Sequence, residues 1–306
     1  MNLVEQRVID FVAATASKEP TPGGGAIAAL TAATGAALAE MVANLTFGKK
    51  GYEEVQSEME ELQTKAEAIR NRMLELSQAD ADVFNIFMDA LGLPKNTDEE
   101  KATRTAAIQQ AYKDAIKAFY DAGCRYLQFD DVYWGSLCNN HLKPEFEADK
   151  AQALENIQVV LAAKPANMVI TTHVCRGNFR STYLLTGAYD PIADALFGQT
   201  QYDGYFLEYD DERSGGFEPL KHFANNPHKG RVVLGLISSK FPELEDKAVI
   251  KARIKEATQY VPLEQLCLSP QCGFASTEEG NIMTEAQQWA KVRYVEEIAK
   301  EVWGED

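Results

Sequence analysis

From Leu3 to about Tyr120, the pattern of apolar and polar positions repeats with the period of an α-helix. Apolar side chains recur three or four positions apart, and glycine and proline are confined to a few breaks. This pattern predicts an all-α segment. The helices expected in it are Val4–Thr15, Ala26–Asn44, Tyr52–Leu93 and a last helix that starts at a capping box of Asn96 and Glu99 and runs to about Ala122.

The expected helix Ala26–Asn44 differs from the others because it has almost no polar face. A helix of this kind is normally buried against other helices. We expect the N-terminal helices either to cover the open part of the sheet described below or to join two chains into a homodimer through Ala26–Asn44. The helix follows the loop Pro20-Thr21-Pro22-Gly23-Gly24-Gly25, in which three glycines relax the restriction on the backbone.

After Gly123 the pattern changes to short β-rich runs separated by longer helical stretches. Strand and helix alternation of this kind indicates parallel βα units. A closed barrel of this class needs eight strands. We therefore predict an α/β fold, a partial TIM-type (β/α) barrel with about five parallel strands, preceded by the all-α segment, with domains at residues 1–110 and 111–306. The expected strands are Arg125–Asp130, Met168–His173, Gly204–Tyr209, Val232–Ile237 and Leu266–Ser269.

Charge and composition narrow the class of protein. The 306 residues are 45% apolar, which is enough for a sizeable core, and the net charge of −16 argues against nucleic acid or an anionic membrane as a partner. No apolar run is expected to reach the roughly 20 residues of a membrane helix, and Met1–Gln6 lacks the pattern of a signal peptide. We expect a cytoplasmic protein. Its five cysteines are expected to be reduced and free to bind a metal.

Four residues at the ends of the predicted strands form a candidate metal site. His173 and Cys175 are separated by one residue, so the period of a strand points both side chains to the same face. Glu208 and Cys272 also follow apolar strand runs, at the C-terminal ends where barrel active sites lie. One histidine, two cysteines and a carboxylate suit tetrahedral zinc, whereas Mg²⁺ and Ca²⁺ prefer oxygen. The alternative is that the histidine and cysteines are ordinary core residues.

The same residues carry a resemblance to a known family. The stretch from about Ala111 to Trp303 resembles the last five βα units of the C-terminal domain of cobalamin-independent methionine synthase, above all in its shorter bacterial relatives that lack the N-terminal barrel. In that family a His-x-Cys pair, a later strand-end Glu and a Cys in a Pro-x-Cys-Gly turn bind zinc. The resemblance therefore implies the zinc ligands His173, Cys175, Glu208 and Cys272.

The resemblance extends to the substrate site. The family's Gln-x-Asp-Glu segment corresponds to Gln128-Phe129-Asp130-Asp131, in which Asp131 replaces the glutamate. It implies that Asp130 holds the amino group of homocysteine, with Gln128 in the same site. Without the resemblance, Asp130 could equally cap the following loop. Arg176 could bind a substrate carboxylate through two hydrogen bonds, or pair with acidic neighbours at the surface.

The resemblance also implies a reaction. Zinc would keep the thiol of homocysteine deprotonated, and the sulfur would attack the methyl group of methyltetrahydrofolate. Two departures affect this reaction. Methionine synthases carry a histidine, thought to donate a proton to the folate, where this chain has Leu236–Lys240. The first three strands of the barrel are missing, and with them part of the folate surface.

A second resemblance covers the helical segment. Residues from about Val8 to Gln109 resemble the beginning of the cyclodeaminase domain of formimidoyltransferase-cyclodeaminase and of bacterial methenyltetrahydrofolate cyclohydrolase. The resemblance implies folate binding by the loop and an acidic active-site role for Asp80. A glycine-rich turn that opens a helix offers N–H groups and a positive dipole end to a folate carboxylate, although it could merely allow a close helix contact. The stretches that match are Ser17–Gly25 (including Pro22, Gly23, Gly24 and Gly25), Met41–Thr46, Gly48–Lys50 and Ala79-Asp80 followed by Phe84.

Both resemblances are to enzymes of reduced folates, and each stops where the other begins, near Ala107–Tyr112. The first hypothesis is a zinc-dependent methyltransferase with small-molecule thiol and folate substrates. The second is a methenyltetrahydrofolate cyclohydrolase or formiminotetrahydrofolate cyclodeaminase that uses the loop and Asp80. The third is a fusion of two truncated folate enzymes that catalyses neither reaction.

Overall fold

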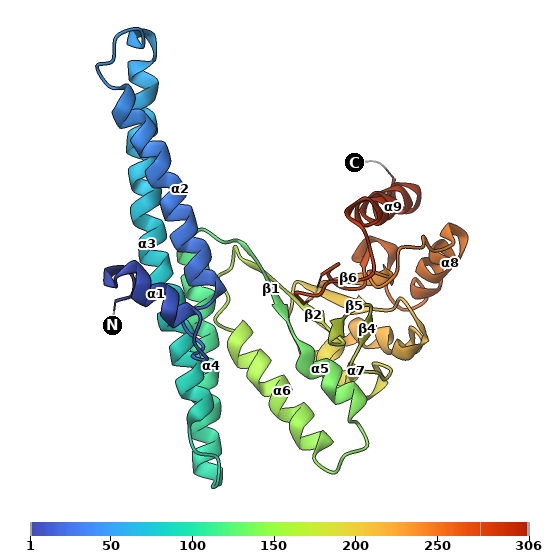
Figure 1. Cartoon of the computed structure of the whole chain (residues 1–306). Coiled ribbons are helices and arrows are strands. Elements are labelled where there is room, and N and C mark those ends of the chain that lie inside the picture. The colour runs from blue at the N-terminus through green and yellow to red at the C-terminus, as the bar shows by residue number, and fades with distance from the viewer. Residues whose placement is uncertain (1, 276, 305–306) are drawn as a thin grey trace. The chain divides into compact units, whose positions relative to one another are not determined.

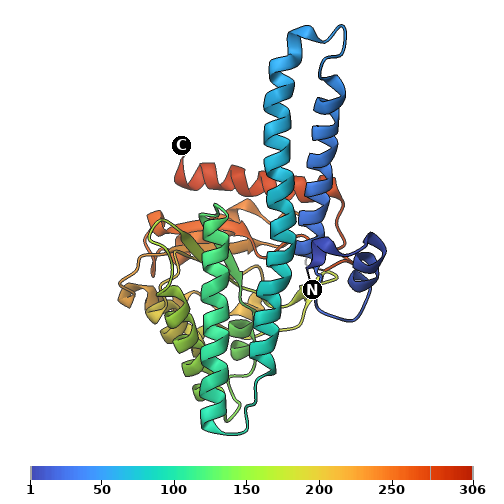
Figure 2. The same cartoon turned by 90° about the vertical axis from the view of Figure 1, so that its left-hand side faces the viewer.

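A computed structural model of the chain describes residues 2–275 and 277–304. Contacts within the chain divide it into two compact units, Met1–Ala115 and Ile116–Asp306. Figures 1 and 2 show the two units from perpendicular directions. Each unit is described by itself below.

The first unit is helical, as predicted. α2 and α3 lie side by side as a long hairpin (Figure 1). A small core forms where α1 meets the base of this hairpin, with Phe11, Ala26 and Ala81 buried together. The helices are η1 (Leu3–Glu5), α1 (Val8–Thr15), α2 (Gly24–Thr46), η2 (Glu53–Val55), α3 (Gln56–Gly92) and α4 (Asp98–Asp121), the last of which continues into the second unit.

The capping box at the start of α4 lies one residue later than predicted. Thr97 Oγ1 accepts a hydrogen bond from the N–H of Glu100 at 3.2 Å, and the Glu100 carboxylate accepts one from the N–H of Thr97 at 3.1 Å. The pair predicted from the sequence was Asn96 and Glu99. Both pairs have the right spacing, and the helix uses the one whose cap is a threonine.

α2 begins in the glycine-rich loop, where Asp80 from α3 takes the place of a capping side chain. The N-cap residue Gly23 has no side chain, and the N–H of Ala26 donates to Asp80 Oδ2 at 2.9 Å. Ser77 Oγ donates to the carbonyl of Ala26 at 2.9 Å. A Cβ on Gly25 would stand 2.2 Å from Asp80 Oδ1, so any other residue here would have to displace the Asp80 carboxylate.

α2 is apolar along its length but is mostly exposed within the described chain. Leu38, Val42 and Leu45 are each more than half exposed, at 56%, 53% and 66%. By length and composition α2 could cross a membrane, so the expectation that no apolar run reaches this length is wrong. This is weak evidence for a membrane, because the core helix of a soluble protein passes the same test.

The second unit contains the predicted parallel sheet. Its five strands have the order β1-β2-β5-β6-β7, and every neighbouring pair is parallel. This order confirms the predicted partial barrel of five strands. The strands are β1 (Tyr126–Asp130), β2 (Val169–Val174), β5 (Gly204–Glu208), β6 (Arg231–Ile237) and β7 (Leu266–Pro270).

Helices connect the strands, and a short hairpin that the sequence did not predict follows β2. The hairpin pairs β3 (Asn178–Phe179) with β4 (Thr182–Tyr183) in antiparallel fashion. The α-helices are α5 (Val132–Asn139), α6 (Phe146–Leu161), α7 (Asp190–Gln199), α8 (Lys247–Ala257) and α9 (Glu285–Trp303), and the 3-10 helices are η3 (Glu212–Ser214), η4 (Glu218–Asn225) and η5 (Leu263–Gln265).

The two faces of the sheet have different roles. On one face, apolar residues such as Ile170, Leu207 and Leu234 are buried in the core that the helices cover. The register pairs Asp130 with His173 and His173 with Phe206, so these three side chains lie on the opposite face. That face corresponds to the interior of a barrel, and it places polar residues at the C-terminal edge of the sheet.

We expect substitution of Gly25 by alanine to weaken the N-terminal end of α2. The new methyl group would collide with the Asp80 carboxylate and cost about 1–3 kcal/mol, as overpacking usually does. Amide hydrogen exchange in α2 of the full chain measures the effect, and faster exchange is expected. Gly24→Ala is the matched control, because no atom lies within 4 Å of its Cβ position and alanine favours a helix. Equal exchange in the two variants would contradict the close contact.

Candidate metal centre

The four predicted metal donors meet at the C-terminal edge of the sheet. His173 lies in β2 and Cys175 directly follows it, Glu208 ends β5, and Cys272 comes two residues after β7. One donor atom from each lies within 4.8 Å of all the others. His173 Nε2 is 3.7 Å from Glu208 Oε1, and the two sulfur atoms are 4.0 Å apart. Residues up to about a hundred positions apart are thus brought to one place.

The chemistry of this set fits a zinc ion. His173 Nε2 is buried and has no hydrogen-bond partner in the described part of the chain, although buried polar atoms are normally satisfied. The two sulfur atoms are too far apart for a disulfide, whose bond is about 2.05 Å. Two sulfurs, one nitrogen and one carboxylate oxygen are donors that zinc accepts in tetrahedral sites.

The surroundings of the Cys175 thiol oppose its ionisation when no metal is bound. The hydrogen bond with Cys272, followed by burial, raises the pKa of Cys175 well above its ordinary value. Desolvation alone would lower the pKa of His173, but its hydrogen bond to Cys175 and the charges of Cys175 and Glu208 outweigh desolvation and raise the pKa. A cation is therefore needed to hold the thiolate form that binds metals.

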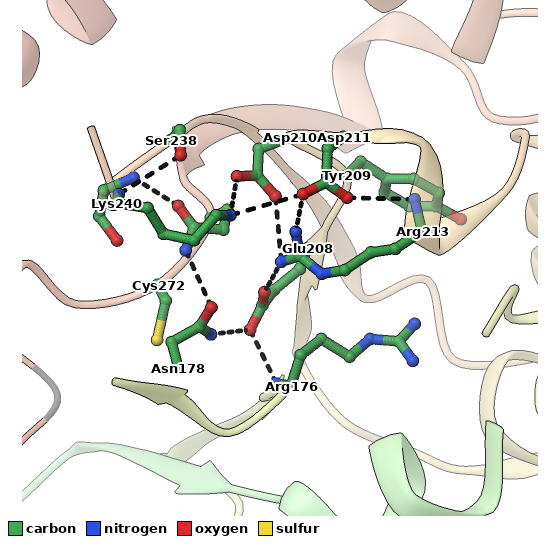
Figure 3. Close-up of polar contacts among 12 residues, drawn as sticks. Arg176, Asn178, Glu208, Tyr209, Asp210, Asp211, Arg213, Ser238, Lys240 and Cys272 are labelled. Atoms are coloured by element: carbon green, nitrogen blue, oxygen red, sulfur yellow. Dashed lines mark hydrogen bonds and ion pairs between the residues drawn. The ribbon is translucent and has the colours of Figure 1, made fainter. Parts of the chain in front are cut away.

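The Glu208 carboxylate is fully buried, and three donors satisfy it (Figure 3). Oε1 accepts hydrogen bonds from the N–H of Arg176 at 2.9 Å and from Asn178 Nδ2 at 2.6 Å. Oε2 accepts one from the guanidinium of Arg213 at 2.5 Å. A buried carboxylate is stable only when it is paired and hydrogen-bonded in this way. Sequence analysis did not identify Asn178 or Arg213 as partners of Glu208.

A network of charged side chains, all buried except that of Asp211, continues from Arg213 away from the candidate metal donors (Figure 3). Arg213 lies 3.1 Å from Asp210 and also pairs with Asp211, and Lys240 pairs with Asp210. The ring of Tyr183 lies 4.2 Å from the Arg213 guanidinium. Lys240 belongs to the segment in which the sequence lacks the family's histidine, and its amino group is held by these carboxylates.

The predicted substrate residues occupy two different environments. Asp130 and Gln128 lie exposed on β1, on the same face as His173, and Asp130 is its register partner. The Arg176 side chain is fully buried, with its guanidinium 4.4 Å from the ring centre of Tyr189, and it points away from Glu208 (Figure 3). Only its main-chain N–H reaches the candidate site.

The predicted folate residues lie in the first unit. Pro22, Gly23, Gly24 and Gly25 lead into α2, and Asp80 meets them at the helix N-terminus through its bond to the N–H of Ala26. The structure thus brings the loop and the acidic residue together. The Asp80 carboxylate itself occupies the N–H of Ala26 that the sequence suggested for a ligand carboxylate.

Comparisons with known proteins identify two families along the chain. Residues 87–292 match the family described as "Cobalamin-independent synthase, Catalytic domain". Residues 7–124 match the family described as "Formiminotransferase-cyclodeaminase". The first match covers more than half of the 306 residues and includes all four candidate donors.

Individual relatives agree with this division. Uncharacterized protein YxjG of Bacillus subtilis is 51% identical over 203 residues, which are 64% of this chain and 53% of that protein. Methenyltetrahydrofolate cyclohydrolase of Methylorubrum extorquens is 50% identical over 105 residues, 34% of this chain and 50% of that enzyme. This chain therefore spans about half the length of these relatives.

A solved structure supports the fold of the second unit. The putative vitamin-B12 independent methionine synthase from Listeria monocytogenes is 46% identical and superposes with a TM-score of 0.55. The match covers 68% of this chain and 57% of that one. Together with the five-stranded parallel sheet, it indicates a part of a TIM-type barrel.

We expect Asp131→Asn to stabilise the second unit in a pH-dependent way. Burial raises the Asp131 pKa from 3.8 to about 6, although the N–H groups of Trp134 and Tyr133 oppose the shift. Between these values the folded protein holds a proton that the unfolded chain releases, so wild-type stability falls as pH rises from about 4 to about 6. At pH 7 the variant should be more stable by up to about 3 kcal/mol, because each pKa unit is worth about 1.4 kcal/mol.

Denaturant unfolding at several pH values tests this expectation. Asp130→Asn is the matched control, since it makes the same change one residue away on an exposed side chain. A stability difference between Asp131→Asn and wild type that does not change between pH 4 and pH 7 would contradict the raised pKa.

Proposed function

Because the chain belongs to the cobalamin-independent synthase catalytic-domain family over residues 87–292, we propose that it is a zinc-dependent methyltransferase. The reaction moves a methyl group from methyltetrahydrofolate to a thiol such as homocysteine. The observation that carries this proposal is the meeting of four side chains suited to zinc, one atom of each within 4.8 Å of the others, at the C-terminal edge of the sheet. Barrel enzymes of this class build their active sites at that edge.

In this proposal His173, Cys175, Glu208 and Cys272 hold the zinc. When bound, zinc keeps the thiol of the substrate in the thiolate form at neutral pH. Arg213, Asn178 and the N–H of Arg176 hydrogen-bond to the buried Glu208 carboxylate and orient it toward His173. The protein thus fixes the position of one carboxylate donor before a metal binds.

Asp130 orients the substrate. Its exposed carboxylate lies on the face of the sheet that also carries His173, where it can accept hydrogen bonds from the ammonium group of an amino-acid thiol. Gln128 lies on the same face, two residues further from the C-terminal edge of the sheet than Asp130. Arg176 contributes through its main-chain N–H, since its guanidinium would have to leave Tyr189 to reach a substrate carboxylate.

The reaction also requires a proton. The sulfur forms a bond to the methyl carbon while the bond between N5 and that carbon breaks, and N5 receives the electron pair and a proton. Leu236–Lys240 contains no histidine, and Lys240 is held by Asp210. The proton in this chain must therefore come from another group or from water.

Metal analysis and a methyl-transfer assay test the proposal. We expect the purified chain to hold one zinc ion and to methylate homocysteine with methyltetrahydrofolate. Cys175→Ser and Cys272→Ser should each lose zinc. Their rate of methyl transfer should fall at least about 30-fold, because without zinc only a few per cent of the substrate thiol is ionised at pH 7. Removal of zinc by a chelator should have the same effect, and added zinc should reverse it.

Cys267→Ser is the matched control, because Cys267 is a partly buried cysteine in β7 outside the donor set. A chain that methylates homocysteine equally well without metal would contradict the role of zinc. A zinc-loaded chain that transfers no methyl group would favour the third hypothesis, an inactive fusion.

A second candidate function rests on the first unit. We propose methenyltetrahydrofolate cyclohydrolase or formiminotetrahydrofolate cyclodeaminase activity as the alternative, supported by the match of residues 7–124. The glycine-rich loop and Asp80 would form its folate site. A folate carboxylate would have to compete with Asp80 for the N–H of Ala26.

Hydrolysis of methenyltetrahydrofolate, followed by absorbance, tests the alternative. Asp80→Ala should lower this rate at least about 10-fold, as expected when an acid–base group is removed. It should leave methyl transfer unchanged. Wild type without cyclohydrolase or cyclodeaminase activity would contradict the alternative.

We also propose that two chains associate through Ala26–Asn44. The exposed apolar side chains of α2 support this, because a single described chain leaves them in water. The molar mass in solution, measured by light scattering, decides between one chain and two.

A further inference from the structure

Asn178, the first residue of β3, contacts two of the metal donors with one carboxamide. Its side chain is 3% exposed. The nitrogen Nδ2 donates to Glu208 Oε1 at 2.6 Å and lies 3.9 Å from the sulfur of Cys175. The hairpin that carries Asn178 thus reaches from the end of β2 to the end of β5.

The other end of the same carboxamide connects to the third donor-bearing loop. Asn178 Oδ1 accepts a hydrogen bond from Nε2 of Gln271 at 3.4 Å. Gln271 is 1% exposed and directly precedes Cys272 in the chain. Two carboxamides in series therefore join the loop of Cys272 to Glu208 and Cys175.

Gln271 is itself held firmly against β6. Its N–H donates to the carbonyl of Ile237 at 2.8 Å, and its Oε1 accepts from the N–H of Ser239. Gly235 leaves room for it, since a Cβ there would stand 2.7 Å from the Cα of Gln271. The position of Gln271, and so the start of the Cys272 loop, is set by contacts outside the donor set.

The carboxamide at position 178 suits both of its neighbours, because it donates from its nitrogen and accepts at its oxygen. The side facing Glu208 and Cys175 must donate, because a carboxylate and a thiolate only accept. The side facing Gln271 Nε2 must accept. Aspartate has the same shape but offers a second negative charge to Glu208, and apolar residues would leave the buried oxygen of Glu208 with one donor fewer.

We propose that Asn178 and Gln271 are positioning residues for the metal. The pair orients Glu208 Oε1 and holds the loops of Cys175 and Cys272 so that the four donors are spaced for one ion. This inference rests on the zinc site of the proposed function. Substitution of residues that orient metal ligands in this way typically lowers the metal affinity about 10–100-fold.

Competition with a chromophoric chelator measures the zinc affinity of Asn178→Ala, Gln271→Ala and the double variant, in the full chain. Each single variant should bind zinc about 10–100-fold more weakly than wild type. The double variant should lose little more than Asn178→Ala alone, because the two residues act through one another. With Co²⁺ in place of Zn²⁺, the visible absorption spectra of the two single variants should differ from that of wild type. Such a difference reports a changed arrangement of the thiolates around the metal.

Asn226→Ala is the matched control, because Asn226 is an equally buried asparagine that bonds to the carbonyls of Phe197 and Thr200, away from the donors. It should keep the wild-type affinity and Co²⁺ spectrum. If Asn178→Ala does not fold, as judged by circular dichroism of the metal-free protein, Gln271→Ala decides the matter. The hydrogen bonds of the Gln271 side chain go to Asn178 and to the N–H of Ser239, neither of which is a proposed metal ligand.

The outcomes separate this inference from the proposed function. Wild-type affinity and spectrum in Gln271→Ala and in folded Asn178→Ala, or losses no larger than those of Asn226→Ala, would overturn the positioning role alone. A wild-type chain that binds no zinc would overturn both. A wild-type chain that binds zinc but transfers no methyl group would overturn the proposed reaction and leave the positioning role standing.

Discussion

The structure of the candidate site depends on burying one carboxylate, Glu208, at the end of a central strand. A buried charge without partners would be costly, so the surrounding chain must supply donors. Arg213 comes from the loop after the same strand, whereas Asn178 and the N–H of Arg176 come from the segment after β2. Meeting this requirement draws the loops of neighbouring strands together. The candidate metal donors lie at the ends of those strands or on the loops that follow them.

The parallel sheet explains why the donors can meet at all. Parallel strands end at the same edge, so residues far apart in the chain reach one place without long excursions. The cysteine thiols, however, are set 4.0 Å apart in surroundings that keep Cys175 protonated. The protein therefore places the two thiols near each other, whereas the negative charge of their thiolate forms has to be stabilised by a cation.

The helical unit buries less of its apolar surface than the unit that contains the sheet. Its small core lies at the base of the α2–α3 hairpin, and much of α2 remains apolar and exposed. The glycine-rich loop is used to bring Asp80 against the start of α2. A residue that resemblance assigns to catalysis thus also has a structural role, as a cap for a helix that lacks one.

The sequence by itself determined the periodic features: the helices, the five parallel strands and the strand-end positions of His173, Cys175, Glu208 and Cys272. Periodicity reveals these because each depends on neighbouring residues. Two predictions from the sequence were wrong: the residue that caps α4, and the expectation that no apolar run is long enough to cross a membrane. Only the tertiary structure decided that Arg213 and Asn178 hold Glu208 and that Gln271 supports Cys272. Contacts between residues such as Asn178 and Gln271, 93 positions apart, leave no periodic signal, because they arise only when strand ends converge.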